Sequence, residues 1–424
     1  MKRSPLLPIF LVVLVDVLGF TIVYPLLPFY AERFHATPLI ATMLVSVYAL
    51  CSLFSTPVIG RLSDQFGRRR LLLISQAGTF AGFIVLGFAN GLTMLFLGRI
   101  LDGLTAGNLS TAQAYISDHT EPENRAKAFG MIGIAFGVGF TVGPGLAGWL
   151  QGYGMHWPFV AAACLSAASM VCSYTLLEPG VSAANLSAPP GPGGKRPAVF
   201  DLGVYLDFFR RPGLGSLYLQ FFLFTFSFSA FMSGFALFAE RRFTWTAREV
   251  GFLFTYSGFL GIILQGGLIG RLVKRFGEPG IALAGFVSIV VAYIVLGFTM
   301  ALPLLLAVTT VSAFGNGVLR PVVTSEITQQ VARHEQGVAI GISGSLSSLA
   351  MTIAPPIGGS LIDHAGLVGG VIDQGWLRMW TLVPATAAVI GLAAALVTRA
   401  RKAAAAPVAP AVAAAADRTG DAGG

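Results

Sequence analysis

The chain has 424 residues, of which 55% are hydrophobic and 11% are charged, and its formal net charge is +8. Soluble domains carry about 25% charged residues, so this composition leaves too few polar side chains to cover a water-facing surface. The sequence therefore predicts an integral membrane protein. Its basic residues fall in short clusters between apolar segments, which is typical of membrane topology and not of a nucleic-acid-binding surface.

A helix that crosses the hydrocarbon core of a bilayer needs roughly 20 apolar residues. Twelve segments meet this requirement, and we expect each to form a transmembrane helix. They cover residues 8–29, 41–61, 71–89, 92–114, 129–150, 157–177, 213–238, 249–271, 280–299, 302–324, 337–361 and 377–398. The first segment has a basic start but no small-residue cleavage site, so we expect a retained helix and not a removed signal peptide.

Two polar or low-complexity segments divide the chain. Residues 179–212 are rich in proline, glycine and polar residues, and they separate six predicted helices in 1–178 from six more in 213–400. Residues 401–424 are rich in alanine, proline and glycine without periodicity, so a disordered tail is predicted there. The expected architecture is an all-α membrane protein of two six-helix bundles joined by a cytoplasmic linker.

Basic residues also indicate the orientation of the chain. With a cytoplasmic N-terminus, the cytoplasmic segments hold about 20 of the 27 lysine and arginine residues and the opposite side about five, as the positive-inside rule requires. We therefore expect both termini in the cytoplasm. The protein would be a multi-pass monomer in the lipid bilayer of the bacterial cytoplasmic membrane.

Other classes of membrane protein lack support in the sequence. It contains no phosphate-binding Gly-Lys-Ser/Thr loop of an ATP-driven pump and no filter loop or charged ring of a channel. The three cysteines lie in apolar segments and the five histidines near segment ends, so no disulfide framework, metal site or enzyme active site is predicted.

A basic hairpin occurs once in each half of the chain. Gly60–Arg70 reads GRLSDQFGRRR between two apolar segments, and in the second half Gly270–Gly277 reads GRLVKRFG. Asp118 at the end of the fourth predicted helix corresponds to Glu326 at the end of the tenth. A parallel repeat of two six-helix halves is a known plan of membrane transporters, and the sequence predicts that plan here.

These motifs resemble those of the major facilitator superfamily. Gly60–Arg70 resembles the family's hairpin signature between helices 2 and 3, Gly139–Gly148 resembles the helix 5 signature of proton-coupled antiporters, and Arg99–Gly103 is similar to the helix 4 arginine motif. The resemblance runs over nearly the whole chain, and it is closest to the tetracycline–proton antiporter class.

The resemblance implies proton-driven efflux of a small organic, amphipathic compound or drug, by rocking of two bundles around a central cavity and with no cofactor. The alternative is a proton-coupled importer or a facilitator of a sugar or other small metabolite. Tetracycline exporters of this class carry membrane aspartates in helices 3 and 9, whereas Thr79–Ile84 and Ser288–Tyr293 contain no carboxylate. This departure speaks against tetracycline itself as the substrate.

Three charged residues within the predicted helices are candidates for proton coupling. Asp16 lies midway along the first segment, and Arg99 and Asp102 lie three residues apart in the fourth. An ionisable group in the hydrocarbon core costs at least about 2.5–3.5 kcal/mol, so it needs a partner or a function. We predict that Asp16 carries the coupled proton and that Arg99 modulates its movement with Asp102 as a resting partner. Permanent structural pairing of these charges is the alternative.

Eight residues are predicted to contact the substrate: Phe20, Tyr24, Gln113, Gln220, Tyr256, Gln265, Asn316 and Arg320. Helical spacing places Phe20 and Tyr24 on the face of Asp16, and Gln113 on the face of Arg99, with Asn108 opposite as a packing residue.

Arg320 shares a face with Asn316 and could bind an anionic group of the substrate. Its alternative is a position near the membrane interface, where the long side chain reaches water. For Gln220, Tyr256 and Gln265 the alternative is a packing hydrogen bond.

The hairpin and the fifth predicted helix are assigned to conformational change and not to substrate binding. Five residues are predicted to form a gate across helices 2, 4 and 11 that closes the cytoplasmic side in the outward-facing state: Gly60, Asp64, Gly67, Arg68 and Asp118. Four residues of the fifth helix are predicted to let helices pack closely, through small side chains and a proline bend: Gly139, Gly143, Pro144 and Gly148.

Overall fold

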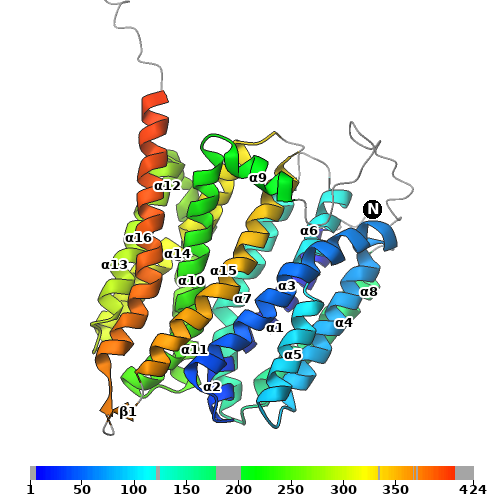
Figure 1. The fold of residues 1–424 in the computed structure, drawn as a ribbon. Coiled ribbons are helices and arrows are strands. Elements are labelled where there is room, and N and C mark those ends of the chain that lie inside the picture. Colours follow the sequence, from blue (N-terminus) through cyan, green and yellow to red (C-terminus); the bar gives the residue numbers. More distant parts are fainter. Residues whose placement is uncertain are drawn as a thin grey trace, which may run out of the picture.

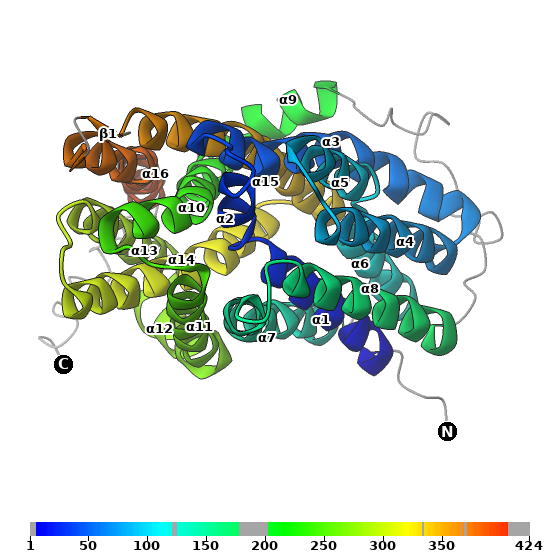
Figure 2. The same cartoon turned by 90° about the horizontal axis from the view of Figure 1, so that it is seen from below.

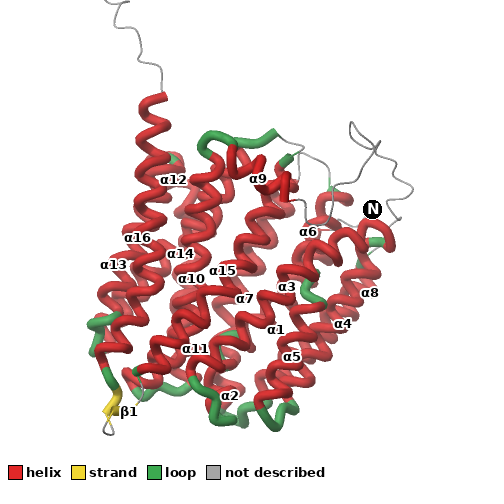
Figure 3. Tube along the Cα trace, viewed as in Figure 1, coloured by secondary structure: helices red, strands yellow, loops and turns green. Residues whose placement is uncertain are grey.

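The computed structural model describes residues 6–120, 125–177, 202–332, 335–365, 367–368 and 371–405. Most of them form long helices that run side by side (Figures 1 and 3). The strands within this part of the chain are β1 (Leu367–Val368) and β2 (Val371–Ile372), which pair antiparallel. The predicted all-α membrane fold is confirmed, apart from this short hairpin.

The first bundle contains the helices from α1 to α8. They are α1 (Leu6–Val23), α2 (Leu27–Glu32), α3 (Pro38–Phe66), α4 (Arg68–Gly87), α5 (Leu92–Leu104), α6 (Asn108–His119), α7 (Arg125–Gln151) and α8 (Trp157–Leu176). The start of α3 follows from its sequence: the Thr37 hydroxyl accepts from the Ile40 N–H at 3.4 Å, and Pro38 occupies the first turn, where no backbone donor is needed.

The second bundle contains the helices from α9 to α16. They are α9 (Leu202–Arg210), α10 (Leu214–Phe243), α11 (Ala247–Ile263), the π-helical turn η2 (Leu264–Leu268), α12 (Ile269–Phe276), α13 (Glu278–Leu296), α14 (Leu302–Gln329), α15 (Gln336–His364) and α16 (Gln374–Ala405). Seen along the helices, the two bundles lie side by side (Figure 2). The boundary between them falls largely within residues 178–201, which lie outside the described residues, so the domain limits remain a prediction.

Each of the twelve predicted spans coincides with a helix or with a run of consecutive helices. Within the described residues, ten helical segments are long and apolar enough to cross a membrane. The first and fourth predicted spans are not single long helices. Residues 8–29 are divided between α1 and α2, and residues 92–114 between α5 and α6.

The tail and the linker differ from the prediction in detail. The tail was expected to be disordered from residue 401, but α16 continues to Ala405, in line with the high helix propensity of alanine. Residues 406–424 lie outside the described part of the chain. Within the predicted linker, α9 forms a helix that bonds to α15 through Tyr205 Oη and Ser345 Oγ, 2.8 Å apart.

Hydroxyl side chains bond the backbone at the interruption between α5 and α6. The Thr56 hydroxyl donates to the Ala106 carbonyl at 2.7 Å, and the Gly107 N–H donates to Ser75 Oγ at 2.9 Å. Lipid offers no hydrogen bonds to a backbone group, so a helix can be interrupted within a membrane only where neighbouring helices supply partners. Thr56 of α3 and Ser75 of α4 supply them here.

The two ends of the protein differ in how the bundles meet. We call the end where α1 begins and α16 ends the terminal end, and the end that holds α2 the distal end (Figure 1). The boundary between the bundles, here called the seam, is formed mainly by α7 against α11 and α3 against α15. At its distal end the backbones touch: a Cβ added to Gly359 would lie 2.9 Å from the Pro38 carbonyl oxygen.

Toward the terminal end the seam opens. Gly341 lies 18 residues before Gly359 in α15, which is about five helical turns, so both face α3. A Cβ added to Gly341 would nevertheless have no atom within 4 Å. In α7 a Cβ at Gly137 would lie 3.4 Å from Ile262 of α11, whereas one at Gly133, a turn nearer the terminal end, would meet nothing. The bundles are therefore closed distally and separated toward the termini.

An ion pair crosses the seam at its closed end. Arg241 Nη2 of α10 lies 2.7 Å from Glu32 Oε1 of α2, and both side chains are about one-fifth exposed, at 19% and 18%. Glu240, the next residue to Arg241, lies 3.5 Å from the same guanidinium. This cluster joins the bundles where no opening is present.

Replacing Ser75 tests the interruption between α5 and α6. Ser75→Ala leaves the Gly107 N–H without its partner, so we expect a loss of about 1–3 kcal/mol of stability, measured by thermal unfolding of the purified protein in detergent. Ser288→Ala is the control, because its hydroxyl donates at 2.7 Å to Ala284 of its own helix. An equal loss in both variants would contradict the role of Ser75.

The shape of the seam predicts a pattern of cysteine labelling. In a chain whose own cysteines are replaced by serine, Gly341→Cys should react with a water-soluble maleimide, because this face of α15 borders open space. Ala354→Cys, at a buried position of the same helix, should not react. Equal labelling of the two positions would show that the terminal end is closed.

Candidate functional site

Asp16 lies inside the first bundle, where α1, α4, α6 and α8 meet. Its carboxyl group lies against the side chains of Ser169, Gln76 and Asn108. Gln76 Nε2 donates to Ser169 Oγ at 2.7 Å, and Ser169 Oγ donates to the Val12 carbonyl at 3.2 Å. Gln76 and Ser169 therefore bond to each other and to the α1 backbone beside the carboxyl group.

Three acceptor oxygens at this site lack a donor among the described residues: Asp16 Oδ1, Gln76 Oε1 and Asn108 Oδ1 are all buried and make no hydrogen bond. Buried polar atoms are rarely left unsatisfied, and each that is calls for an explanation. A protonated Asp16 would supply an O–H donor for one of the two amide oxygens, since a carboxyl group donates only when it carries its proton. The arrangement can therefore hold a proton on Asp16.

Arg99 and Asp102 form a buried ion pair on α5. Arg99 Nη1 lies 2.9 Å from Asp102 Oδ2, and the side chains are only 2% and 6% exposed. The guanidinium also lies 4.2 Å from the centre of the Tyr48 ring, and its Nε donates to the Leu44 carbonyl at 3.4 Å. The pairing that the i, i+3 spacing allowed is therefore present, and α3 holds the arginine in place.

The ion pair also touches α4, the third predicted helix. Asp102 lies against the Thr79 side chain, and a Cβ on Gly82 would come within 3.0 Å of the Asp102 Cβ. Residues 79–84, in which the resemblance led us to look for a carboxylate, contain none. The α4 residues beside Asp102 are thus a threonine and a glycine, neither of which carries a charge. The charged partner of Asp102 is Arg99.

Aromatic side chains connect the ion pair with the seam. The Phe20 ring lies 6.5 Å from the Tyr48 ring and 5.3 Å from the Tyr24 ring, measured between centres. Tyr24 is buried, and its hydroxyl lies against Ser229 of α10 in the second bundle. The predicted substrate residues Phe20 and Tyr24 thus lie between the charged cluster and the opposite bundle.

Two predicted substrate residues of the second bundle lie elsewhere. Gln220 is buried between α10 and α16, where its Nε2 donates to Thr398 Oγ1 at 3.0 Å. Tyr256 bonds to Thr310 at 2.8 Å on the face of α11 that carries the exposed Phe252. Gln220 and Tyr256 therefore each make a hydrogen bond within the second bundle, which is the packing role given above as the alternative to substrate contact.

Of the remaining predicted residues, Arg320 contacts the opposite bundle. Arg320 is exposed, and its guanidinium carbon lies 5.9 Å from the centre of the Phe136 ring, which belongs to α7 of the first bundle. One turn away, the Asn316 amide donates to the Tyr293 hydroxyl at 3.3 Å. Gln265 is exposed in η2, and Gln113 is half-buried in α6.

The expectation of one continuous face from Arg99 to Gln113 is wrong. The helix is interrupted between α5 and α6, so helical spacing no longer places Gln113 on the face of Arg99. For the same reason the assignment of Asn108 to packing is wrong, because the new helix directs it at Asp16. Sequence reasoning also missed Gln76 and Ser169, although polar residues within apolar spans were a usable signal.

Three residues of the predicted gate, Asp64, Arg68 and Asp118, form an ion cluster within the first bundle. Arg68 lies 2.8 Å from Asp118 Oδ2, forms an ion pair with Asp64, and donates to Ser63 Oγ at 2.7 Å. Within the described residues this cluster makes no ion pair to α15, in keeping with the open terminal end. Gly67 ends α3 at φ 96°, a conformation that favours glycine. Gly60 has no neighbour within 4 Å of an added Cβ, so its predicted packing contact is not formed here.

The four packing residues of α7 fall into two groups. A Cβ on Gly139 would lie 2.5 Å from Val17, and one on Gly143 would collide with Thr21, both in α1. Gly148 and Pro144 instead meet α11 across the seam, where a Cβ on Gly148 would lie 3.0 Å from the Arg248 Cα. The small residues thus serve packing within the first bundle and at the seam.

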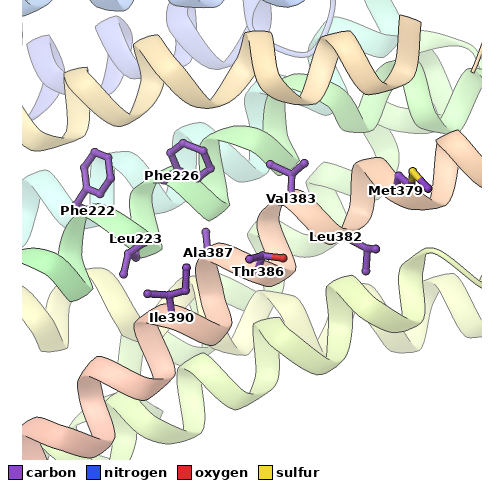
Figure 4. Close-up of a pocket in the computed structure, with 9 residues that line it drawn as sticks. All are labelled: Phe222, Leu223, Phe226, Met379, Leu382, Val383, Thr386, Ala387 and Ile390. Carbon is purple, nitrogen blue, oxygen red and sulfur yellow. The ribbon is translucent and has the colours of Figure 1, made fainter. Parts of the chain in front are cut away.

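An apolar pocket of about 440 Å³ lies between α10 and α16 (Figure 4). Its lining includes Phe222, Phe226 and Met379 and no charged side chain. Met379 and Ile390 are nearly half exposed, at 49% and 48%. This pocket belongs to one bundle and does not include the charged residues described above.

Comparison with known proteins identifies the family of this chain. The family model described as Major Facilitator Superfamily matches residues 9–299 and 217–419. The chain is 30% identical to the Escherichia coli tetracycline resistance protein, class B, over 84% of this chain and 87% of that protein. It is 26% identical to multidrug resistance protein 2 of Bacillus subtilis (strain 168), over 83% and 87%.

A solved structure has the same fold. The crystal structure of the human organic anion transporter MFSD10 (TETRAN) superimposes with a TM-score of 0.69 and 21% identity, covering 93% of this chain and 99% of that one. The repeat, the hairpin, the two bundles and these matches have one consistent explanation. The chain is a multi-pass membrane protein that belongs to the major facilitator superfamily.

Proposed function

We propose that this protein exports a small, amphipathic organic compound from the cytoplasm in exchange for protons. The observation that carries the proposal is the group of buried, donor-less oxygens at Asp16, beside the buried Arg99–Asp102 pair. A transporter driven by protons needs a group that can gain and lose one inside the membrane, and such residues are rarely placed there without a function.

The names of the relatives support export of drug-like compounds. Two of the relatives described above are a tetracycline resistance protein and a multidrug resistance protein. We infer a similar task for this chain, in which the terminal end faces the cytoplasm of a bacterial cell. In that orientation the open terminal end admits substrate from the cytoplasm, which is the step that begins export.

Proton exchange can be linked to bundle movement through Arg99. With a proton on Asp16, the charges within the cluster are balanced, because Arg99 pairs with Asp102. Loss of that proton leaves two carboxylates near one guanidinium, and Tyr48 lies among all three groups. Arg99 would then be shared between Asp16 and Asp102. This movement of the Arg99 guanidinium would act on the neighbouring rings of Tyr48, Phe20 and Tyr24, which extend from the ion pair to the seam.

Replacing Asp16 tests this proposal. In everted membrane vesicles given a proton gradient, the intact protein should accumulate an aromatic dye such as rhodamine 6G or fluorescein, and an uncoupler should abolish this uptake. Asp16→Asn keeps the size of the side chain but holds no exchangeable proton, so gradient-driven uptake should fall to the level of vesicles without the protein.

Asp207→Asn is the matched control, because Asp207 is an exposed carboxylate on α9 that pairs with Arg211. It should leave uptake unchanged. Gradient-driven uptake that persists in Asp16→Asn would refute the assignment of the coupled proton to Asp16.

A further inference from the structure

Arg320 differs from Arg99 in having no carboxylate partner among the described residues. Arg99 is paired with Asp102, but within the described residues no carboxylate lies at ion-pair distance from Arg320. The side chain is exposed, although it lies nine residues before the end of α14. An arginine held in a membrane protein without a counter-ion is available to an anion that enters from outside.

The surroundings of Arg320 place it at the seam. Its guanidinium carbon lies 5.9 Å from the centre of the Phe136 ring, which comes from the opposite bundle. The Phe136 ring is stacked on that of Phe140, with centres 6.4 Å apart and planes inclined by 20°. A guanidinium and a pair of parallel aromatic rings therefore meet between α14 and α7.

Gln265 lies on the adjoining helix. Its neighbour Leu264 is buried, and a Cβ on Gly317 of α14 would lie 2.7 Å from Leu264, so η2 packs directly on the helix that carries Arg320. Gln265 follows Gly261 by one turn, and no atom lies within 4 Å of an added Cβ at Gly261. This face of η2 is open, and π-helical turns of this kind are frequent at functional sites.

We propose that Arg320, Gln265 and Phe136 form a subsite that selects a planar aromatic oxyanion, such as a carboxylate or sulfonate, as the substrate. This inference rests on the proposed export function and adds the substrate class. Guanidinium groups bind such oxyanions through two parallel hydrogen bonds, and the Gln265 amide can donate a further one. The Phe136 and Phe140 rings offer a surface on which an aromatic substrate can stack.

Equilibrium binding tests the subsite without requiring transport. Fluorescein and rhodamine 6G share a tricyclic ring system, but the first is an anion and the second a cation at neutral pH. Fluorescence anisotropy with the purified full chain in lipid nanodiscs gives the affinity for each dye. We expect the intact protein to bind fluorescein more tightly. Arg320→Gln should weaken fluorescein binding at least about tenfold and leave rhodamine 6G binding unchanged or improved.

Two further variants sharpen the result. Arg320→Lys keeps the charge but not the paired donors, so it should restore only part of the fluorescein affinity. Arg399→Gln removes an exposed arginine of α16 and should have no effect. The inference is overturned if the intact protein does not prefer fluorescein, or if Arg320→Gln affects both dyes equally. Failure of the export proposal would appear separately, as anion-selective binding without gradient-driven uptake.

Discussion

Polar groups inside a membrane must find their partners within the protein, and this constraint determines most of what is specific about the structure. It explains why Ser75 and Thr56 lie beside the interruption between α5 and α6. It also explains why Arg99 and Asp102 pair, with Tyr48 against the guanidinium. Asp16 Oδ1 and the Arg320 guanidinium are two groups that lack such a partner among the described residues, and for them we propose a proton and an anion, respectively.

The two places lie on opposite bundles, and the seam relates them. Backbone contact at Gly359 and the Arg241–Glu32 ion pair hold the distal end together, while the face of α15 that contains Gly341 is free. A rigid-body movement that closes the terminal end would bring the Arg68–Asp118 cluster of the first bundle toward α15. Rigid-body movement of packed bundles is a common form of such switching, because packed interfaces adopt discrete arrangements.

The sequence was sufficient for the fold, since twelve apolar spans and a repeated hairpin define it, and for those site residues whose charge alone is unusual in a membrane. Asp16, Arg99, Asp102 and Arg320 are of this kind. Gln76 and Ser169 stand out as polar residues within apolar spans, but the sequence does not show that they and Asn108, on three other helices, meet at Asp16. Membrane helices are apolar on most sides, so hydrophobic periodicity gives little information on which face is buried. For that reason Gln220 and Tyr256 were predicted to contact the substrate, with a packing hydrogen bond as the alternative, and in the structure they bond to Thr398 and Thr310.

We propose that Asp16 holds a proton which substrate movement releases. Infrared difference spectroscopy of the purified protein in lipid observes a protonated carboxyl group directly, through its carbonyl stretching band. On addition of a transported dye, we expect this band to lose intensity in the intact protein, and we expect no such change in Asp16→Asn. An unchanged band in the intact protein, or the same change in both proteins, would contradict it.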